Sequence, residues 1–562
     1  MGKTWTILPK KFNDVLQQLL YNRGIISQSE NDKKIESFLS PNFETDFHDP
    51  ELLPDFHSAI NRISEAIKNN EIIGVYADYD ADGIPGAALF FRALSALGCK
   101  PLVYIPTRVQ GYGFNQSGID YLIDSGCKLI ISVDLGIREI EYAKYLAKKK
   151  IDLIITDHHE PGDIVPNALA VVNPKLESSK YPFRELCGTG VVFKIIQALG
   201  KIYPEVITEK FLKWNLDLVA ISTISDVVPL VDENRVISYF GLKVLSKTRN
   251  IGLQQLYRVA EIDQSKIDAF NVGFQVGPRI NAPGRLDHAT ASFELLVTED
   301  KNKAYELALH LQSKNEKRQE AMDKIFQSAT KKIIDLNLNK DNIIIVSDKN
   351  WQKGVIGPVA SRLVEKFSLP VIVLSEDGDM LDGSCRSISS FDITKALEFC
   401  SKYLDGFGGH SGAAGVHLKK ANLSKFTDAM IKYAKKNIKD EDLLPKLIID
   451  LELQREKISI NLFRSLEKLE PFGLGNSRPI FLTRNLRLIS HRLVGKGDKH
   501  LQLKFTDGIA EYKGVVFNHD LDMKNISTGS EYDIVYQPGL NFWNGKNWID
   551  LRIIDLKISE KL

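Results

Sequence analysis

Short apolar runs alternate with amphipathic stretches through the first half of the chain. The apolar runs are rich in Ile, Val and Leu, and the segments between them carry apolar residues at helical spacing. The runs occupy residues 72–77, 102–105, 129–133, 152–156 and 168–172. Continuous apolar runs of this length suit strands that are buried on both faces, and their alternation with helices is typical of βαβ units. The pattern over about 51–230 therefore predicts an α/β fold with a doubly wound parallel sheet.

The second half of the chain shows three different patterns. Residues 299–337 contain neither Pro nor Gly and mix Lys and Glu with Leu, Ala and Ile, which predicts one long helix with a solvated charged face. Apolar runs beginning at Asn342 and Leu369 enclose a helical pattern, so about 340–440 is expected to form a smaller α/β unit. Beyond about 445, five short strand-like runs separated by turn signals predict a small β-barrel.

These patterns define a domain organisation. At 562 residues the chain is too long for a single core. We expect a small helical lead-in at 1–50, a larger α/β domain at 51–298, a connecting helix at 299–338, a smaller α/β domain at 339–442 and a barrel at 443–562.

Composition excludes several classes of protein. With 43% hydrophobic and 26% charged residues, the chain is typical of a soluble globular protein. The formal net charge of +1 does not by itself indicate a polyanionic partner. The five cysteines are scattered without a C-x-x-C pair, which favours a reduced intracellular protein. No apolar stretch reaches the roughly 18 residues of a membrane span, so we expect no membrane association and a cytoplasmic location.

Acidic residues gather where the predicted strands end. Three aspartates follow the first run, and the others follow the third and fourth runs or close an apolar helix-like stretch. These residues are Asp78, Asp80, Asp82, Asp134, Asp157 with His158 and His159, and Asp226. A single aspartate at such a position is usually a cap. Three within five residues repel one another unless a cation neutralises them, and ligands of α/β sheets bind outside the strand carboxyl ends.

The residue types in this cluster indicate the kind of ion. Carboxylate oxygens with imidazole nitrogen suit Mn²⁺, Mg²⁺ or Zn²⁺ rather than a soft thiolate site. So many anionic groups imply two ions, and paired cations are suited to in-line displacement at phosphorus. The pattern therefore predicts a metal-dependent phosphodiesterase.

The motifs that carry these residues resemble a known family. DYDADG, SVDLGI, TDHH and SDVVPL are similar, in this order, to the four metal-site motifs of the DHH phosphoesterase superfamily. Within it the chain most resembles the RecJ family of single-strand-specific 5′-to-3′ DNA exonucleases, because FGGHSGAAG, GPRINAPGR and LEPFGLGN are also similar to RecJ segments. The resemblance implies a DHH domain, a DHHA1 domain and a C-terminal OB-fold, two Mn²⁺ or Mg²⁺ ions, and a role in DNA recombination and repair beside a helicase and a single-strand-binding protein.

The resemblance also implies roles for the acidic cluster. Residues expected to bind the metals directly are Asp80, Asp82, Asp134, His158 and Asp226. Asp134 is the expected bridging ligand, because its segment presents one isolated acid at the centre of the sheet. Asp78 and Asp157 are expected to orient their neighbours, as carboxylates do for metal-bound histidines. His159 is expected to hydrogen-bond the scissile phosphate or the leaving oxygen.

Two segments of the larger α/β domain are candidates for DNA contact. In PTRVQGYGFN, Arg108 is expected to contact a phosphate and Tyr112 to lie under a base, although a Gly-rich turn with a packed tyrosine fits the local sequence equally well. In GPRINAPGR, Arg279, Asn281 and Arg285 stand among glycines and prolines. This spacing predicts an irregular binding loop rather than a helix, with a solvated surface loop as the alternative.

The smaller α/β domain carries further candidates. Five glycines surround His410 in GFGGHSGAAG, which predicts a loop that admits a ligand close to the backbone. In GSCRSIS, the resemblance assigns Ser384 and Arg386 to the terminal phosphate of the DNA. Trp351-Gln352 departs from the Trp-His that RecJ sequences commonly have, so no role is assigned there.

The predicted barrel offers charged and aromatic side chains to a single strand. They are Arg492, Lys496, Lys499, His500, Phe542 and Trp543. Charge tracking and base stacking are the expected functions, with core packing as the alternative for the aromatic residues.

Two other functions fit the same motifs. A DHH/DHHA1 phosphodiesterase would degrade short oligonucleotides or cyclic dinucleotides, but such substrates do not require an added barrel. A non-catalytic replication scaffold on the same fold would be expected to have lost metal ligands, whereas every acidic motif of this chain is intact.

Overall fold

The computed structural model describes residues 3–27, 32–286, 288–443, 446–495, 497–517, 526–543 and 546–559. The chain forms two compact units. The larger unit comprises Trp5–Gly277, Phe293–Ala304 and Leu447–Leu562, and the smaller unit comprises Met1–Thr4, Pro278–Ser292 and Tyr305–Lys446. In the part of the chain that the structure describes, no helix has both the length and the apolar character needed to cross a bilayer.

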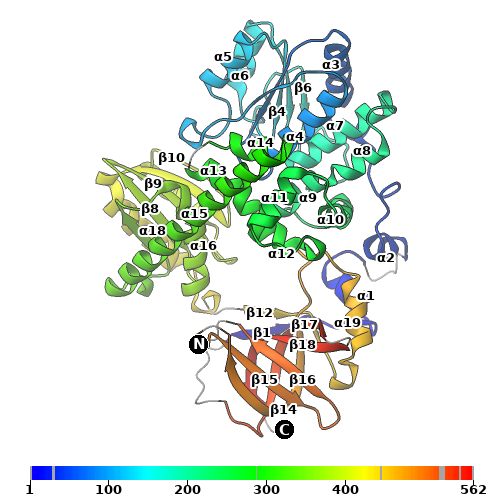
Figure 1. The fold of residues 1–562 in the computed structure, drawn as a ribbon. Helices are drawn as coiled ribbons and strands as arrows, with labels where there is room; N and C mark the ends of the chain where they lie inside the picture. The colour runs from blue at the N-terminus through cyan, green and yellow to red at the C-terminus, as the bar shows by residue number, and fades with distance from the viewer. Residues whose placement is uncertain are drawn as a thin grey trace. The chain divides into compact units, whose positions relative to one another are not determined.

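A five-stranded parallel sheet organises the first half of the larger unit. Its strands are β2 (Ile73–Ala77), β3 (Leu102–Tyr104), β4 (Leu129–Val133), β5 (Asp152–Thr156) and β6 (Ala170–Val172). Their order is β3-β2-β4-β5-β6, so β4 lies at the centre (Figure 1). Every residue of β2 and β4 is buried, as expected for strands covered on both faces. The predicted parallel sheet is confirmed.

Helices cover both faces of this sheet. Residues of α5 (Gln116–Asp124) and α6 (Ile140–Lys148) share a hydrophobic core with one face. On the other face, α3 (Phe56–Lys68), α4 (Gly83–Ala96) and α7 (Gly188–Ile202) contact the strands (Figure 1). The chain continues through α8 (Glu209–Trp214), α9 (Leu216–Ser225), α10 (Asp232–Leu245), α11 (Ile251–Val259) and α14 (Thr290–Val297).

The segment predicted as an irregular binding loop is helical instead. It forms α12 (Ala269–Asn271), a π-helix labelled η4 (Val272–Val276) and α13 (Gly277–Leu286). Pro278 closely follows the π-helical turn, and Pro283 lies inside α13, so the helix accommodates two residues that lack a backbone N–H. Gly277 serves packing, because a Cβ there would lie 2.3 Å from Ser225 Oγ. Gly277 therefore reflects close helix packing rather than irregular backbone.

The long helix is confirmed as α15 (Lys301–Asp335), with 35 residues. In the smaller unit, β7 (Ile344–Asp348), α16 (Ile356–Phe367) and β8 (Val371–Asp377) follow. Next come β9 (Met380–Arg386), α17 (Ile393–Phe399), β10 (Gly406–His410), β11 (Ala413–Lys419) and α18 (Leu423–Asn437). The sheet order is β10-β11-β9-β8-β7, with β7 and β8 parallel and the other pairs antiparallel.

The Gly-rich segment around His410 is a β-hairpin rather than the predicted loop. Strands β10 and β11 pair from Gly406↔His417 to His410↔Ala413, leaving only Ser411 and Gly412 between them. The backbone hydrogen bonds of the ladder hold an extended conformation that the glycine content alone does not favour.

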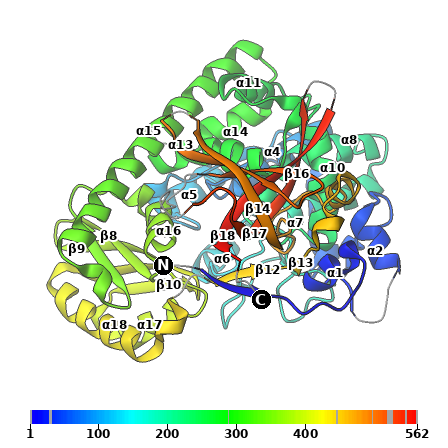
Figure 2. The ribbon, with the colours of Figure 1, turned by 90° about the horizontal axis from the view of Figure 1, so that it is seen from below.

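The C-terminal part of the larger unit is a closed barrel. Its strands are β14 (Phe481–Val494), β15 (His500–Thr506), β16 (Glu511–Val516), β17 (Glu531–Trp543) and β18 (Lys546–Ile558). They follow the order β14-β15-β16-β18-β17, and β17 pairs with β14 to close the barrel (Figure 2). The predicted barrel is confirmed. Lys496 and the side chains of Phe542 and Trp543 lie outside the described residues.

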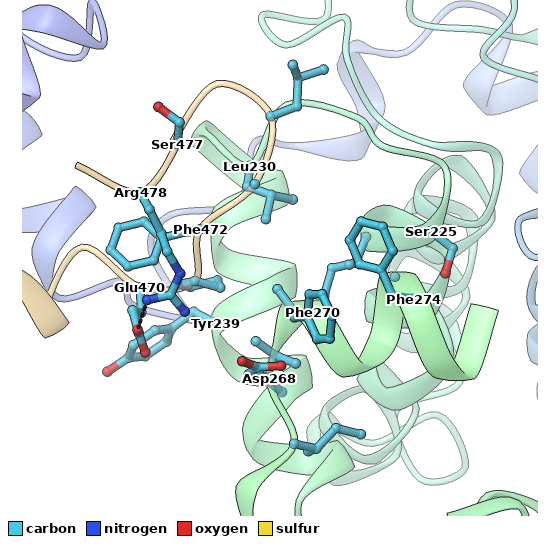
Figure 3. Close-up of a pocket in the computed structure, with 18 of the residues that line it drawn as sticks. Ser225, Leu230, Tyr239, Asp268, Phe270, Phe274, Glu470, Phe472, Ser477 and Arg478 are labelled. Carbon is cyan, nitrogen blue, oxygen red and sulfur yellow. Dashed lines mark ion pairs between the residues drawn. The ribbon is translucent and has the colours of Figure 1, made fainter. Parts of the chain in front are cut away.

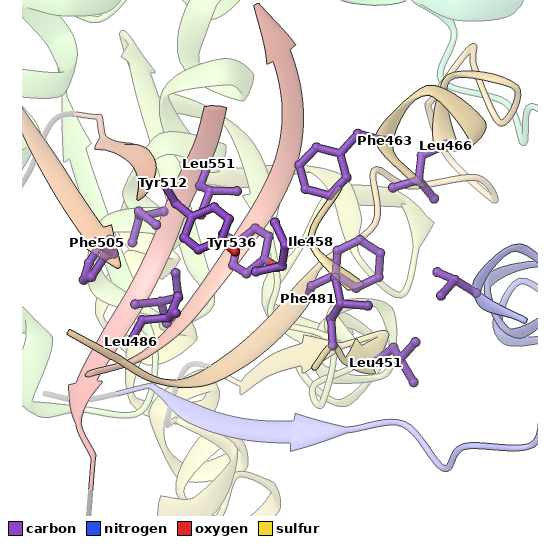
Figure 4. Close-up of a cluster of buried hydrophobic side chains, with 14 of the residues drawn as sticks. Leu451, Ile458, Phe463, Leu466, Phe481, Leu486, Phe505, Tyr512, Tyr536 and Leu551 are labelled. Carbon is purple, nitrogen blue, oxygen red and sulfur yellow. The ribbon is translucent and has the colours of Figure 1, made fainter. Parts of the chain in front are cut away.

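Side chains near the start of the chain pack in the barrel core. Figure 4 shows its centre, with Phe481, Phe505, Tyr536 and Leu551 packed together. Side chains of α1 (Val15–Asn22) and α2 (Asp32–Leu39) belong to the same core, together with β13 (Leu451–Glu452) and α19 (Ile460–Glu467). Strand β1 (Thr4–Ile7) pairs with β12 (Lys446–Ile449). The expected helical lead-in thus also contains a strand, which is too short to show a periodic pattern.

Candidate metal and substrate sites

Three aspartates lie in line at the carboxyl edge of the parallel sheet. Strands β2, β4 and β5 are in register, and each is followed at once by Asp78, Asp134 or Asp157. The ladder continues through these residues, because Asp78 N donates to Val133 O at 3.1 Å and Asp134 N donates to Thr156 O at 2.9 Å. The strand register therefore brings three acids, distant in sequence, to one edge.

The turn into α4 adds Asp80 and Asp82. Asp80 Oδ1 accepts hydrogen bonds from Asp82 N at 2.8 Å and from Gly83 N at 3.0 Å. A Cβ on Gly83 would lie 2.5 Å from the carbonyl oxygen of Asp78, so this tight turn requires glycine.

The buried carboxylate of Asp82 is oriented by a second helix. Its oxygens accept hydrogen bonds from Gly188 N at 2.6 Å and Thr189 N at 2.8 Å, both at the start of α7. Helix N-termini favour anions because their first N–H groups have no intrahelical partner. Gly188 also makes room for Asp134, since a Cβ on Gly188 would lie 2.6 Å from Asp134 Cβ. No sequence pattern had singled out the start of α7.

His158 lies at the centre of the acidic residues. Its Nε2 atom is 3.1 Å from Asp134 Oδ1, 3.6 Å from Asp82 Oδ2 and 3.6 Å from Asp226 Oδ2. Asp226 is the C-cap residue of α9, as its place after an apolar helix-like stretch predicted. Strand ends and a helix end thus converge on one imidazole.

The geometry sorts the cluster into three overlapping groups of possible ligands. In each group the candidate atoms lie within 4.8 Å of one another: Asp78, Asp80 and Asp134; Asp82, His158 and Asp226; Asp134, His158 and His159. All five residues predicted to bind metal belong to these groups. Asp78, expected at the sequence level to orient its neighbours, belongs to one of them as well.

The electrostatics of the cluster fit divalent cations. Burial, followed by repulsion from Asp82 and Asp80, raises the pKa of Asp134 well above its usual range. Burial and the charge of Asp80 raise the pKa of Asp78 in the same way. Asp78 Oδ1 and Asp134 Oδ1 are buried and accept no hydrogen bond. A cation between these oxygens would relieve both the repulsion and the unmet acceptors, and oxygen with imidazole nitrogen suits Mn²⁺ or Mg²⁺.

Asp157 holds His159 at the edge of the cluster. Its Oδ1 atom lies 2.8 Å from His159 Nδ1 and accepts from the backbone N of His158 at 2.7 Å, while Oδ2 accepts from Ile137 N at 2.9 Å. Burial alone would lower the pKa of His159, but the hydrogen bond and charge of Asp157 raise it. Asp157 is thus placed to orient His159.

The loop with Arg108 and Tyr112 lies beside His159. The hydroxyl of Tyr112 is 3.3 Å from His159 Nδ1, and the Tyr112 side chain is 54% exposed. Arg108 is exposed, with its guanidinium carbon 5.7 Å from the centre of the Tyr79 ring. Glu139, which the sequence did not single out, closely approaches the loop, since a Cβ on Gly113 would lie 2.0 Å from its Oε1.

In the smaller unit, Ser384 and Arg386 lie together on one face of β9. Arg386 Nη1 donates to Ser384 Oγ at 3.0 Å and to Cys385 O at 2.8 Å. A Cβ on Gly357, in the first turn of α16, would lie 3.3 Å from both side chains. Burial lowers the pKa of Arg386. Among the described residues no carboxylate forms an ion pair with Arg386, and the nearby helix N-terminus also favours an anion.

The remaining predicted contacts of the smaller unit lie on two elements. Arg279, Asn281 and Arg285 share α13. Arg279 Nε donates to Gln312 Oε1 at 2.7 Å, and Arg285 Nη1 donates to Gly354 O at 3.0 Å. His410 is the last residue of β10 and is exposed.

Comparisons with known proteins agree with this architecture. Three family models match the chain: the DHH family, N-terminal domain, at residues 72–223, the DHHA1 domain at 340–436 and the RecJ OB domain at 449–555. The chain is 36% identical over 520 residues to the single-stranded-DNA-specific exonuclease RecJ of Bacillus subtilis. It is 30% identical over 569 residues to the exonuclease of the same name from Escherichia coli.

Coverage differs between these relatives. The match includes 92% of this chain and 65% of the Bacillus subtilis protein, but 98% of this chain and 96% of the Escherichia coli protein. Among solved structures, RecJ from Thermus thermophilus in complex with Mn²⁺ superposes with a TM-score of 0.83 at 26% identity, covering 100% of this chain and 80% of that one. A second structure, of exonuclease RecJ bound to manganese, has a TM-score of 0.60 at 30% identity and covers 70% of this chain and 97% of that one.

Proposed function

Since this chain belongs to the RecJ family, we propose that it is a metal-dependent exonuclease that hydrolyses single-stranded DNA from the 5′ end, in DNA recombination and repair. The observation that carries the proposal is the convergence of Asp78, Asp82, Asp134, His158 and Asp226 at one buried edge. Such a cluster is poorly stable without cations and well suited to phosphodiester cleavage with them.

Two Mn²⁺ or Mg²⁺ ions would be held by Asp80, Asp82, Asp134, His158 and Asp226. When bound, paired ions of this kind supply a hydroxide nucleophile and stabilise charge on the attacking and leaving oxygens. Asp134 would serve both ions, because it belongs to two of the possible ligand groups and follows the central strand. The unpaired Oδ1 of Asp78 supports it as a further direct donor.

His159 contacts the scissile phosphate. The hydrogen bond between its Nδ1 and Asp157 orients the ring and leaves Nε2 to donate to a phosphate oxygen. The hydrogen bond and charge of Asp157 raise the pKa of His159, and a protonated ring would make a charge-assisted bond to the phosphate. Tyr112 and Arg108, on the neighbouring loop, hold the adjacent base and phosphate.

Ser384 and Arg386 bind the 5′-terminal phosphate, with Arg279, Asn281, Arg285 and His410 as further contacts to the DNA. A terminal phosphate carries more negative charge than an internal diester, and a guanidinium reads that difference bidentately. The N-terminus of α16 beside Arg386 adds backbone partial charge of the right sign.

The barrel holds the strand beyond the metal site. A groove of about 310 Å³ on its surface is lined by His491, Arg492, Gln502, Lys504 and Lys513, among others. Cations along such a groove track phosphates, and Trp548 lies under Lys513 at 5.2 Å. A binding surface of this extent favours long single strands over short oligonucleotides or cyclic dinucleotides. The intact acidic cluster favours catalysis over a scaffold role.

The cellular setting follows from the substrate. The proposed partners are a helicase, which would separate duplex ends, and a single-strand-binding protein, which would coat the exposed strands. We place this activity in the cytoplasm.

Digestion of end-labelled oligonucleotides tests the proposed function. Single- and double-stranded DNA of one sequence, labelled at either end, is incubated with Mn²⁺, with Mg²⁺ or with a chelator. We expect labelled mononucleotides at once from 5′-labelled single strands, progressive shortening of 3′-labelled ones, resistance of the duplex, and no products with the chelator. Shortening from the 3′ end would overturn the polarity, and inactivity with both metals would overturn the enzyme assignment.

A further inference from the structure

The face of the smaller unit's sheet that carries Ser384 and Arg386 continues along β9. Residues two apart on a strand share a face, so Asp382 lies on this face as well, about 6.5 Å from Ser384. Leu381 and Cys385 face the opposite way, into a hydrophobic core shared with α17 and α18. Helix α16 lies on the side of Ser384 and Arg386, and α17 and α18 lie on the other side (Figure 2). Three polar side chains of β9 therefore share one surface beside α16.

The strand register extends this surface over β11 and β10. Three rows of residues run across the three strands: His410, Ala413 and Arg386; Gly408, Gly415 and Ser384; Gly406, His417 and Asp382. A Cβ on Gly406 or Gly408 would meet no atom of the described residues within 4 Å, and a Cβ on Gly415 would meet only two of their backbone oxygens, at 4.0 Å. These three glycines form an open floor, the glycine floor, on which a ligand can approach the backbone.

A cluster of charged side chains borders the third row. Lys353 lies in a short 3₁₀ turn, η6 (Lys353–Val355), directly before α16. Its Nζ is 2.9 Å from Asp382 Oδ2, and Asp382 Oδ1 pairs with His417 Nδ1. Burial alone would raise the pKa of Asp382, but the hydrogen bonds from Lys353 and His417 lower it, so the carboxylate stays ionised. The side chains of Lys353 and His417 are 60% and 49% exposed, and both can also contact a ligand. We call these three residues the Asp382 cluster.

The Asp382 cluster has the chemistry of a phosphate site. A protonated imidazole donates from both nitrogens, so His417 can bind Asp382 through Nδ1 and a phosphate oxygen through Nε2. In the larger unit, Asp157 holds Nδ1 of His159 in the same manner. Lys353 adds an ammonium group with three donors. With His417 protonated, the cluster carries one net positive charge, to which the N-terminus of α16 adds.

A groove of about 780 Å³ in the larger unit is less suited to a highly charged anion. Figure 3 shows that its Arg478 pairs with Glu470, at 3.6 Å. The other charged residues of its lining also balance one another: Lys243, Arg552, Asp268 and Glu467. The three rows of the glycine floor, by contrast, contain a single acid, Asp382, together with Arg386 and two histidines, and Lys353 borders them. The floor therefore favours anions.

We propose that the Asp382 cluster binds the additional phosphoryl groups of a 5′-di- or triphosphate end. Ser384 and Arg386 then bind the phosphoryl group that is attached to the sugar. The step of about 6.5 Å along β9 suits this division, because the second and third phosphoryl groups extend beyond the reach of Ser384. The proposal rests on the proposed function and adds to it a class of substrate: strands that began from a free nucleoside triphosphate and keep it at their 5′ end.

The bonds made and broken stay those of the proposed reaction. Water attacks the phosphorus of an internal diester, and the bond from this phosphorus to the 3′-oxygen of the preceding nucleoside breaks. The 3′-oxygen takes up the proton that the water loses. The released product keeps its 5′-triphosphate, and the shortened strand begins with a 5′-monophosphate. Only the first cleavage of each strand therefore involves the Asp382 cluster.

The first cleavage of strands with different ends tests this subsite. Single strands of one sequence carry a 5′-hydroxyl, a 5′-monophosphate or a 5′-triphosphate, and all carry a 3′ label. The disappearance of the full-length strand is followed with Mn²⁺ and with enzyme in excess over DNA. The variants are Lys353→Ala, His417→Gln and the double variant. Lys435→Ala is the matched control, because Lys435 pairs with Asp341 at 2.7 Å and is 58% exposed but lies on α18, on the other side of the sheet.

Free dTTP, added with Mn²⁺ in excess, distinguishes strand ends from free nucleotides. We expect it to inhibit only well above the concentration of triphosphate strands that half-saturates the enzyme, because a strand is also held at the metal cluster and the barrel. Inhibition at equal concentration would assign the Asp382 cluster to free nucleotides and overturn the proposal.

We expect the wild type to cleave triphosphate strands at least as fast as monophosphate strands. The double variant should lower the ratio of these two rates by about tenfold, since it lacks two charge-assisted contacts at a partly exposed site, and Lys435→Ala should keep the ratio. An unchanged ratio in the double variant, or a wild type that cleaves monophosphate strands but not triphosphate strands, would overturn the subsite alone. A wild type that is inactive on all three ends would overturn the proposed function itself.

Discussion

The Nε2 atom of His158 lies 3.1 Å from the Oδ1 atom of Asp134, and that oxygen accepts no hydrogen bond. The two residues follow different strands of the parallel sheet, β5 and β4. A buried imidazole nitrogen and a buried carboxylate oxygen at this separation can both be satisfied by one cation. Without a cation, Asp134 remains a destabilising group among other acids.

Asp134→Asn should separate stability from metal binding. Without metal, the variant should be at least as stable as the wild type, because the amide removes one charge from a group of repelling acids. Mn²⁺ at about 100 times its dissociation constant should stabilise the wild type by about 2.7 kcal/mol, and the variant by far less. The variant should also fail to cleave DNA. Thermal unfolding with Mn²⁺ or chelator measures this. Asp163→Asn, at an exposed position, is the control, and near-wild-type cleavage by Asp134→Asn would contradict the site.

The metal preference should depend on His158. Carboxylates with one imidazole should favour Mn²⁺ over Mg²⁺ at equal low concentration, since nitrogen ligands favour transition metals. His158→Gln should lower activity with Mn²⁺ and bring the ratio of the Mn²⁺ and Mg²⁺ activation constants closer to one. Metal titrations of the initial cleavage rate provide both constants. A wild-type preference for Mg²⁺ would count against His158 as a ligand.

Arg386→Ala should abolish discrimination between DNA ends. The wild type should cleave 5′-phosphorylated strands faster than 5′-hydroxyl strands. The variant should lose about tenfold to hundredfold in kcat/KM, and only on phosphorylated strands, because hydrogen bonds to charged groups contribute about 1.5–3 kcal/mol. The comparison uses 3′-labelled oligonucleotides with either end. The control is Arg362→Ala. Arg362 lies on the same helix as Gly357 but pairs with Asp323, so this variant should keep the preference. Equal wild-type rates on both ends would refute the assignment.

The barrel groove should contribute to the salt dependence of binding. Arg492 and Lys513 line it and are exposed, so each is placed to contact one phosphate. Replacing either with Ala should reduce the slope of log K against log salt concentration by about 0.7 and weaken binding to all sequences alike. Binding titrations of long single strands at several salt concentrations measure the slope. Lys425→Ala, on α18 of the smaller unit, serves as the control, and an unchanged slope in both barrel variants would remove the groove from the DNA path.

His48 should make stability depend on pH. Its Nε2 lies 2.8 Å from Asp232 Oδ1, and this hydrogen bond raises the pKa of His48 above its usual 6.5. The folded protein therefore holds this proton more tightly than the unfolded chain, and the gain is fully present below about pH 6.5 and is lost as pH rises through the raised pKa.

His48→Asn should accordingly destabilise the protein more at pH 6 than at pH 8.5. The difference should be below about 1 kcal/mol, because the pair is partly exposed to solvent. Urea unfolding at the two pH values measures it, with the exposed His57→Asn as the control. Equal losses at both pH values would show that the His48–Asp232 pair does not couple protonation to folding.

Local sequence was sufficient to predict a helix or strand wherever the burial pattern of that element alone decided its conformation. The strands at 129–133 and 152–156 have the predicted bounds, and the helix predicted over 299–337 extends from Lys301 to Asp335. Apolar runs and helical periodicity record which faces are buried, so they can be read without knowing the partner element. The acidic candidates were found for the same reason, since residues that follow buried parallel strands share one edge.

Tertiary structure alone decided what depends on two distant segments meeting. The glycines and prolines at 277–285 predict a loop, but the segment is helical and its Gly277 packs against Ser225. The Gly-rich segment at 406–415 forms a hairpin because its two strands hydrogen-bond to each other. The first residues join the barrel core only through packing. Sequence patterns report how each segment is buried, whereas contacts and distances between segments depend on the folded chain as a whole.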